Sequence, residues 1–118
     1  KEKGFSKTPF IAKENTSVYA QYTIQINSRD KVINYLKENN IPTSIHYPSL
    51  LSNQEALKKG KKGLINYIFN KKSFKSFKLD VAQEACTKVL SLPMHPLLSE
   101  EDQDLVVNSL LNSINLIG

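Results

Sequence analysis

The sequence predicts an α+β fold: a small, mainly antiparallel sheet of three to four strands covered by helices, in the order β-α-β-loop-α-β-α. Two patterns lead to this class. Apolar and polar residues alternate over residues 18–26, as in a half-buried strand, whereas apolar residues recur at helical spacing over 29–39 and 99–115. The length of 118 residues, 40% of them hydrophobic, suits one domain over 1–118 with one core.

The first half is expected to hold a lead-in, a strand, a helix and a second strand. Residues 1–16 show no periodicity and are predicted to be irregular. The helix at 29–39 follows the capping candidates Asn27 and Ser28 and ends at Asn39 or Asn40, and the extended segment 41–47 stops before Pro48. The strand at 18–26 places five side chains on one face: Val18, Ala20, Tyr22, Ile24 and Ile26.

The second half is expected to hold a loop, a helix, a strand and a terminal helix. A helix is predicted over residues 80–88 and a strand over 89–92, which Pro93 ends. Residues 99–102, SEED, resemble a capping box at the start of an amphipathic helix that reaches about residue 115. Its expected core positions are Leu105, Val106, Leu110, Leu111 and Ile114.

Residues 58–78 form a basic block with eight lysines and no acidic residue, inside a chain of net charge +5. The block also contains four aromatic residues, so it could bind single-stranded nucleic acid, an anionic ligand or a partner subunit. A solvated insertion or loop is the favoured interpretation and nucleic acid is unlikely, because nearly all basic residues are lysines and charge runs are usually solvated.

Several classes of protein are excluded by composition. The lone Cys86 can form neither an internal disulfide nor a thiolate metal site, and we expect it to be a small buried hydrophobic residue of a helix. The four glycines fit no phosphate-binding loop. No apolar run approaches a membrane helix, which favours a soluble cytoplasmic protein without a membrane partner, and a start at Lys1 leads us to expect a piece of something longer.

His46 is the main candidate for a site residue on chemical grounds. It ends a predicted strand and precedes Tyr47, at a point where a rigid sheet gives way to a loop that can shape a pocket. The more common alternative is a structural histidine that bonds the loop backbone. His95, which follows the strand at 89–92, leaves the same two alternatives open with weaker support.

Three separated blocks together resemble the C-terminal small domain of the DegT/StrS sugar aminotransferases. These are fold-type-I enzymes that use pyridoxal phosphate (PLP). The blocks are residues 17–24, SVYAQYTI, residues 41–48, IPTSIHYP, and residues 89–96, VLSLPMHP, which LSEED at 98–102 follows. Order and spacing agree over about residues 17–112. The combination is far more specific than any one block.

The resemblance implies amino transfer from glutamate, through PLP, to a keto carbon of a nucleotide-linked sugar in surface polysaccharide biosynthesis. In the family the Schiff-base lysine lies in a large domain upstream, so no catalytic residue is assigned here and no PLP is expected on this chain alone. The implied partners are that large domain and a homodimer mate. By motif, His46 and Tyr47 would face the nucleotide-sugar, with Tyr22 behind them.

The sequence departs from the family pattern beside this motif. Relatives commonly have a Pro-Leu-His run and a Gln-Pro pair here, where this chain has Leu50-Leu51-Ser52 and Gln54-Glu55, and Asn40 replaces a usual glycine. A vestigial, regulatory or interaction domain, with its basic loop on nucleic acid or a partner, is therefore the alternative. The first block resembles a subgroup that acts on 3-keto N-acetylated sugar uronates; a 4-keto sugar stays open.

Overall fold

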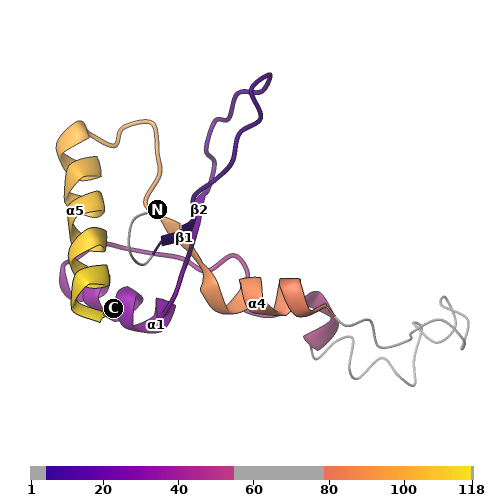
Figure 1. Ribbon diagram of the computed structural model, residues 1–118. Helices are drawn as coiled ribbons and strands as arrows, with labels where there is room; N and C mark the ends of the chain where they lie inside the picture. The colour runs from indigo at the N-terminus through magenta and orange to yellow at the C-terminus, as the bar shows by residue number, and fades with distance from the viewer. Residues whose placement is uncertain (1–4, 55–78, 118) are drawn as a thin grey trace, which may run out of the picture. The chain divides into compact units, whose positions relative to one another are not determined.

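The computed structural model describes residues 5–54 and 79–117, which fall into two units (Figure 1). The first unit combines Lys1–His46 with Lys88–Gly118, and the second is Tyr47–Thr87. The lysine-rich block at 58–78 lies outside the described residues.

The first unit is built on an antiparallel sheet in the order β1-β2-β3. β1 is Phe5–Lys7, β2 is Tyr22–Ile26 and β3 is Val89–Leu92. In the register of β2 against β3, Ile24 faces Leu90 and Thr23 faces Ser91. The predicted α+β class is confirmed, while the strands that make up the sheet differ in part from those expected.

β2 begins four residues later than the alternation pattern predicted. Val18 is 93% exposed, Ala20 is also exposed, and neither belongs to the strand. Tyr19 has a φ of 45°, which breaks an extended backbone, and Tyr22 already faces Leu92, the last residue of β3. The prediction that Val18 belongs to this strand was wrong, because Tyr22 already pairs with the last residue of β3.

The predicted strand at 41–47 is reduced to a single bridge between Ser44 and Ser91, whose backbone N–H and C=O groups bond each other at 2.8 and 3.1 Å. In an antiparallel ladder the next such pair lies two residues along, which here is Pro42 with Pro93. Both are prolines without an N–H group, so the ladder cannot continue in that direction.

β1 lies within the lead-in that was expected to be irregular. It pairs with β2 through Phe5 opposite Ile26 and Lys7 opposite Gln25, with a shift of register between the two pairs. A strand of three residues with such a shift is too short to produce a period-2 pattern, so alternation could not reveal it.

Two helices of the first unit pack against each other and against one face of the sheet (Figure 1). α1 is Arg29–Glu38 and α5 is Glu100–Ile117, close to the predicted ranges. Leu105 was wrongly expected in the core: it is 54% exposed, while Ser109 and Ser113 are buried beside the predicted positions. The hydrophobic core consists of Ile24, Ile26, Val32, Leu36, Ile41, Leu90, Val106, Leu110 and Ile114.

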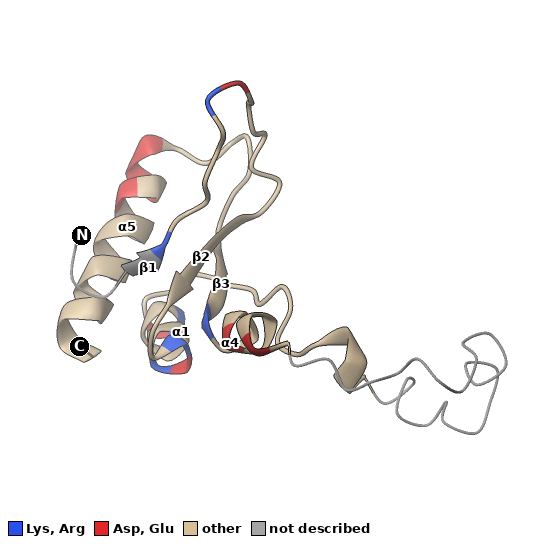
Figure 2. Ribbon diagram, turned by 45° about the vertical axis from the view of Figure 1, so that its right-hand side comes forward, with Lys and Arg blue, Asp and Glu red and all other residues tan. Residues whose placement is uncertain are grey.

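The two helices begin differently. At α5 the Ser99 hydroxyl accepts the Asp102 N–H at 3.1 Å, as the capping-box pattern predicted. Three acidic residues occupy its first turn, where the helix dipole favours negative charge (Figure 2). At α1, Ser28 is the N-cap but its side chain makes no capping bond, because its backbone is left-handed with a φ of 52°. Asn40, with a φ of 59°, is the predicted left-handed stop after α1.

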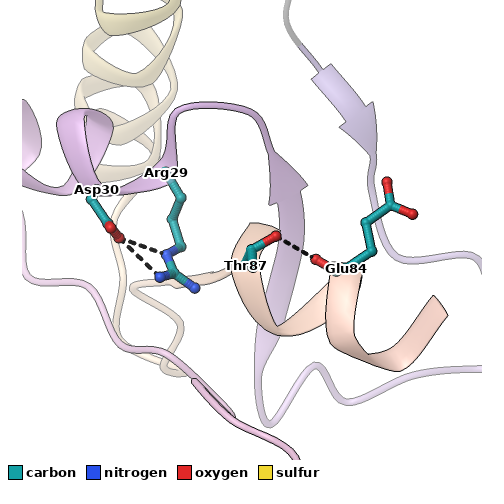
Figure 3. A network of polar contacts seen from close by, with 4 residues as sticks. All are labelled: Arg29, Asp30, Glu84 and Thr87. Carbon is teal, nitrogen blue, oxygen red and sulfur yellow. Dashed lines mark hydrogen bonds and ion pairs between the residues drawn. The ribbon is translucent and has the colours of Figure 1, made fainter. Parts of the chain in front are cut away.

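α4, Asp80–Lys88, lies at the predicted position and leads directly into β3, and η1 is a short 3-10 turn at Leu51–Asn53. Within α4 the Thr87 hydroxyl donates to the Glu84 carbonyl at 2.7 Å (Figure 3). Cys86 is half-buried, less enclosed than expected. No helix among the described residues is long and apolar enough to cross a membrane.

Candidate functional site: a pocket at the edge of β3

The candidate site is a pocket of about 320 Å³ in the first unit. Three separated stretches of the chain form it: the approach to β2, the segment after α1 and the end of β3 with its following loop. The lining residues are Ala20, Gln21, Pro42, Thr43, Ser44, His46, Ser91, Leu92, Pro93, Met94 and His95. The volume is at the lower end of the range for small-molecule sites, which suits one sugar ring better than a whole nucleotide-sugar.

Strand pairing explains why hydroxyl groups gather behind this pocket. The backbone groups of Ser91 bond to Ser44 on one side, so on its other side Ser91 and Thr23 form the close, non-hydrogen-bonded type of antiparallel pair. Their side chains share the sheet face opposite the core, and the Thr23 Oγ1 to Ser91 Oγ distance is 2.8 Å. Cross-strand pairs of this kind stabilise a sheet and fix side-chain positions.

His46 shares a hydrogen bond with the Ser91 hydroxyl of this pair. It follows Ser44 by two residues, is half-buried, and places Nδ1 3.0 Å from Ser91 Oγ. The sequence had left a ligand-facing histidine and a structural histidine bonded to the loop backbone as alternatives. One partner of the His46 ring is a side-chain hydroxyl on β3, and His46 lines the pocket.

His95 lines the same pocket from the loop after β3. Its side chain is exposed, and Nδ1 accepts a hydrogen bond from the Leu97 N–H at 3.2 Å. The two histidines, 49 positions apart in sequence, therefore meet at one site.

The two tyrosines proposed with His46 have different surroundings. Tyr22 is on the core face of β2, where it packs against the hydrophobic cluster and against the ring of Tyr19, with ring centroids 5.4 Å apart. Tyr47 is 73% exposed and belongs to the second unit. Neither lines the pocket.

Sequence reasoning did not single out Thr23, Ser91 or Gln21 as site residues. Thr23 and Ser91 are the polar positions of two strands whose apolar neighbours face the core, so alternation could have placed each on the outer face. The register that brings them together is a property of the fold.

The pocket is lined by hydrogen-bonding groups, and the two histidines are its only ionisable side chains among the described residues. Among the described residues that line it there is no lysine, arginine, aspartate or glutamate. Among the described residues, no group of three or more His, Cys, Asp or Glu side chains could hold a metal ion. Binding and orientation of a polar ligand are what such a site can do chemically.

Three features together define an aminotransferase domain. They are an antiparallel sheet with this pocket beside its last strand, the IPTSIHYP segment, and the LPMHP end of β3. The chain belongs to the DegT/DnrJ/EryC1/StrS aminotransferase family, whose sequence profile matches residues 2–111.

Among curated relatives, the chain is 38% identical over 105 residues to the UDP-2-acetamido-2-deoxy-3-oxo-D-glucuronate aminotransferase of Pseudomonas aeruginosa PAO1. It is 36% identical over 93 residues to a pleiotropic regulatory protein of Geobacillus stearothermophilus. It is 26% identical over 105 residues to the dTDP-3-amino-3,6-dideoxy-alpha-D-galactopyranose transaminase of Aneurinibacillus thermoaerophilus. These matches cover 89%, 79% and 89% of the chain but only 25%, 22% and 25% of the relatives.

Solved structures show the same partial coverage. A DegT DnrJ EryC1 StrS aminotransferase from Brucella abortus is 32% identical with a TM-score of 0.69, over 90% of this chain and 25% of the other. DesV of S. venezuelae, solved with a ketimine intermediate, shares the fold with a TM-score of 0.63 at 22% identity, over 97% of this chain and 25% of the other. The chain thus spans about a quarter of the length of the proteins it matches.

The pocket does not fit PLP, the cofactor on which the family in general depends. That cofactor needs a lysine for its Schiff base and an acidic partner for its pyridine nitrogen. The lining contains neither. No chemical step on the cofactor is therefore assigned to the residues of this pocket.

Proposed function

We propose that this chain is the C-terminal domain of a cytoplasmic, PLP-dependent nucleotide-sugar aminotransferase and forms one wall of its sugar site. The observation that carries the proposal is the pocket, which joins the IPTSIHYP segment and the end of β3 around His46 and His95. Its uncharged, hydrogen-bonding lining suits a sugar. The chain itself binds and orients the acceptor, and the cofactor and its lysine belong to the large domain of the full-length enzyme.

The three residues proposed from the sequence take different parts. His46, which lines the pocket, contacts the nucleotide-sugar directly. Tyr47, which is exposed, contacts the same substrate, the large domain or the homodimer mate in this proposal. Tyr22 packs against the core and acts behind the site, by holding the start of β2 next to the pocket residue Gln21.

The acceptor is proposed to be a 3-oxo sugar uronate linked to a nucleotide, used for surface polysaccharide. Two relatives support this choice by name: the P. aeruginosa enzyme has a 3-oxo glucuronate substrate, and the A. thermoaerophilus enzyme is named after a 3-amino sugar. Both names place the reacting carbon at position 3 of the sugar.

The test is an amino-transfer assay on the full-length protein that carries this chain. With glutamate as donor, we expect a UDP-linked 3-oxo sugar uronate to become the 3-amino sugar, with one 2-oxoglutarate formed per amino sugar. The matched control is a 4-oxo nucleotide-sugar, which should react more slowly. Preference for the 4-oxo sugar would refute the position, and no transfer to either would refute the enzymatic proposal.

A regulatory or vestigial role is the second candidate, and the likeness to the pleiotropic regulatory protein favours it. In that case the full-length protein would aminate no sugar. The lysine-rich block at 58–78 would then be the first region to test, because a nucleic-acid contact there predicts affinity that falls steeply with salt.

A further inference from the structure

Gln21 lies at one end of a row of residues that crosses the pocket. Tyr22 pairs with Leu92, so the next position along this register places Gln21 opposite Pro93. On the other side of β3, Pro42 lies opposite the same proline. All three residues line the pocket. This Gln21 row (Pro42, Pro93 and Gln21) therefore brings two apolar rings next to one amide group.

The backbone of Gln21 is anchored on both sides, although the residue itself is exposed. Tyr19 before it has a φ of 45°, and its N–H donates to the Ser17 hydroxyl oxygen at 3.1 Å. Tyr22 after it packs against the hydrophobic core and against the Tyr19 ring. The turn and the start of β2 thus fix the point from which the Gln21 side chain extends.

The amide group of Gln21 has no hydrogen-bond partner within the part of the chain that the structure describes. By contrast, the Gln54 amide donates to the Ser49 hydroxyl oxygen and the Gln103 amide donates to the Leu98 carbonyl. A glutamine amide supplies two N–H donors and one C=O acceptor. At Gln21 these groups are available to a ligand of the pocket.

We propose that the Gln21 row is the subsite for an N-acyl group of the acceptor sugar, with Gln21 as its specificity-determining residue. An N-acyl group has one N–H donor and one C=O acceptor, which an amide side chain complements. Its alkyl part needs apolar surface, which the two proline rings provide. A carboxylate or phosphate calls for a cationic partner, and the described lining residues include no lysine or arginine.

This inference rests on the proposed function, which supplies the nucleotide-linked sugar, and adds the substituent that the pocket recognises. In the proposed acceptor, carbon 1 carries the nucleotide, carbon 3 the oxo group and carbon 6 the carboxylate. Carbon 2 lies between the nucleotide and the reacting carbon. It is the position to which we assign the N-acyl group.

The test measures binding of two nucleotide-sugars that have no oxo group and so cannot accept an amino group. UDP-N-acetylglucosamine and UDP-glucose differ only at carbon 2, which carries an acetamido group in the first and a hydroxyl in the second. Isothermal titration calorimetry on the full-length protein that carries this chain gives the Kd of each. We expect the acetamido sugar to bind about tenfold more tightly, the usual effect of one or two hydrogen bonds to a ligand.

Two variants of Gln21 test its part in this preference. Gln21→Ala should weaken binding of UDP-N-acetylglucosamine about tenfold and leave that of UDP-glucose within about twofold. Gln21→Glu keeps the length of the side chain but loses its N–H donors, so it should remove the same preference. The matched control is Gln83→Ala, because Gln83 is also exposed and its amide has no partner among the described residues, yet it lies on α4 outside the pocket lining. It should change neither Kd.

Three results would overturn the inference: equal affinity of the unmodified protein for the two sugars, an acetamido preference that survives in Gln21→Ala, or an equal loss of both sugars in that variant. Failure of the proposed function gives a different result. A protein that binds neither nucleotide-sugar and transfers no amino group would refute the proposed function, and this inference with it. An enzyme that aminates the 3-oxo sugar but shows no acetamido preference would refute only this inference.

Discussion

The contrast between the N-caps of α1 and α5 gives a prediction that can be worked from the structure. The two perturbations are Ser99→Ala and Ser28→Ala, the same chemical change at two helix starts of one unit. The Ser99 hydroxyl accepts the Asp102 N–H at 3.1 Å and donates to Asp102 Oδ2 at 2.9 Å. The Ser28 side chain makes no capping bond. Only the first change removes a hydrogen bond from a helix.

The expected magnitudes follow from these contacts. Loss of the Ser99 cap leaves one backbone N–H of α5 to water and should lower the free energy of unfolding by about 1 kcal/mol. Ser28→Ala should change it by less than about 0.5 kcal/mol, as at an exposed position without a specific bond. Ser28→Gly should raise it by about 0.5–1 kcal/mol, because glycine adopts a φ of 52° without the steric cost of a Cβ atom.

The assay is urea unfolding of the 118-residue chain and the three variants, followed by far-UV circular dichroism. Equal slopes with shifted midpoints would show that stability changed and the unfolded state did not. Equal losses in Ser99→Ala and Ser28→Ala would refute the assignment of the cap to Ser99. A destabilised Ser28→Gly variant would refute the left-handed backbone at Ser28.

Two further predictions concern packing and charge. Leu36→Ala should lower the free energy of unfolding by about 2–5 kcal/mol because Leu36 is fully buried. Leu105→Ala should change it by less than about 1 kcal/mol because Leu105 is exposed. Similar urea midpoints for the two variants would contradict this assignment of the core. Asp30→Asn should cost less than about 1 kcal/mol although Asp30 lies 2.9 Å from Arg29, because its side chain is exposed (Figure 3); a larger shift of the midpoint would show that this ion pair is a structural anchor.

The sequence pattern predicted correctly those helix and strand boundaries that depend on a few neighbouring residues. The left-handed Asn40 follows the end of α1, Pro93 follows the end of β3, and Ser99 caps the start of α5. Each signal is contained in a few neighbouring residues. Helical spacing likewise placed Val106 and Leu110 in the core. These features needed no knowledge of the remaining chain.

Features that depend on pairing were predicted less well. The start of β2 depends on where β3 ends, and the segment at 41–47 fails to become a strand because Pro42 meets Pro93 across the ladder. Leu105 follows the helical period and is exposed all the same, since the face of α5 toward the sheet is narrower than the apolar pattern.

The candidate site was predicted in part. His46 was singled out from its position at a strand end and from its motif, and the structure places it in the pocket. The contacts of His46 could not be predicted, because serine and threonine are common on outer strand faces and only the register joins Thr23 with Ser91, 68 positions away. His95 was noted as a weaker candidate, and only the fold brings it to His46.

The proposed place of His46 on the sugar side of an aminotransferase is tested most directly by the His46→Ala variant of the full-length protein. The two half-reactions are measured separately, together with the melting temperature. We predict that kcat/KM for amination of the nucleotide-sugar falls about 10- to 100-fold, the usual effect of one or two lost hydrogen bonds to a ligand. The glutamate half-reaction should hardly change because it precedes binding of the sugar, and the melting temperature should hardly change because His46 is only half-buried. Equal losses in both half-reactions, with a lower melting temperature, would contradict the claim.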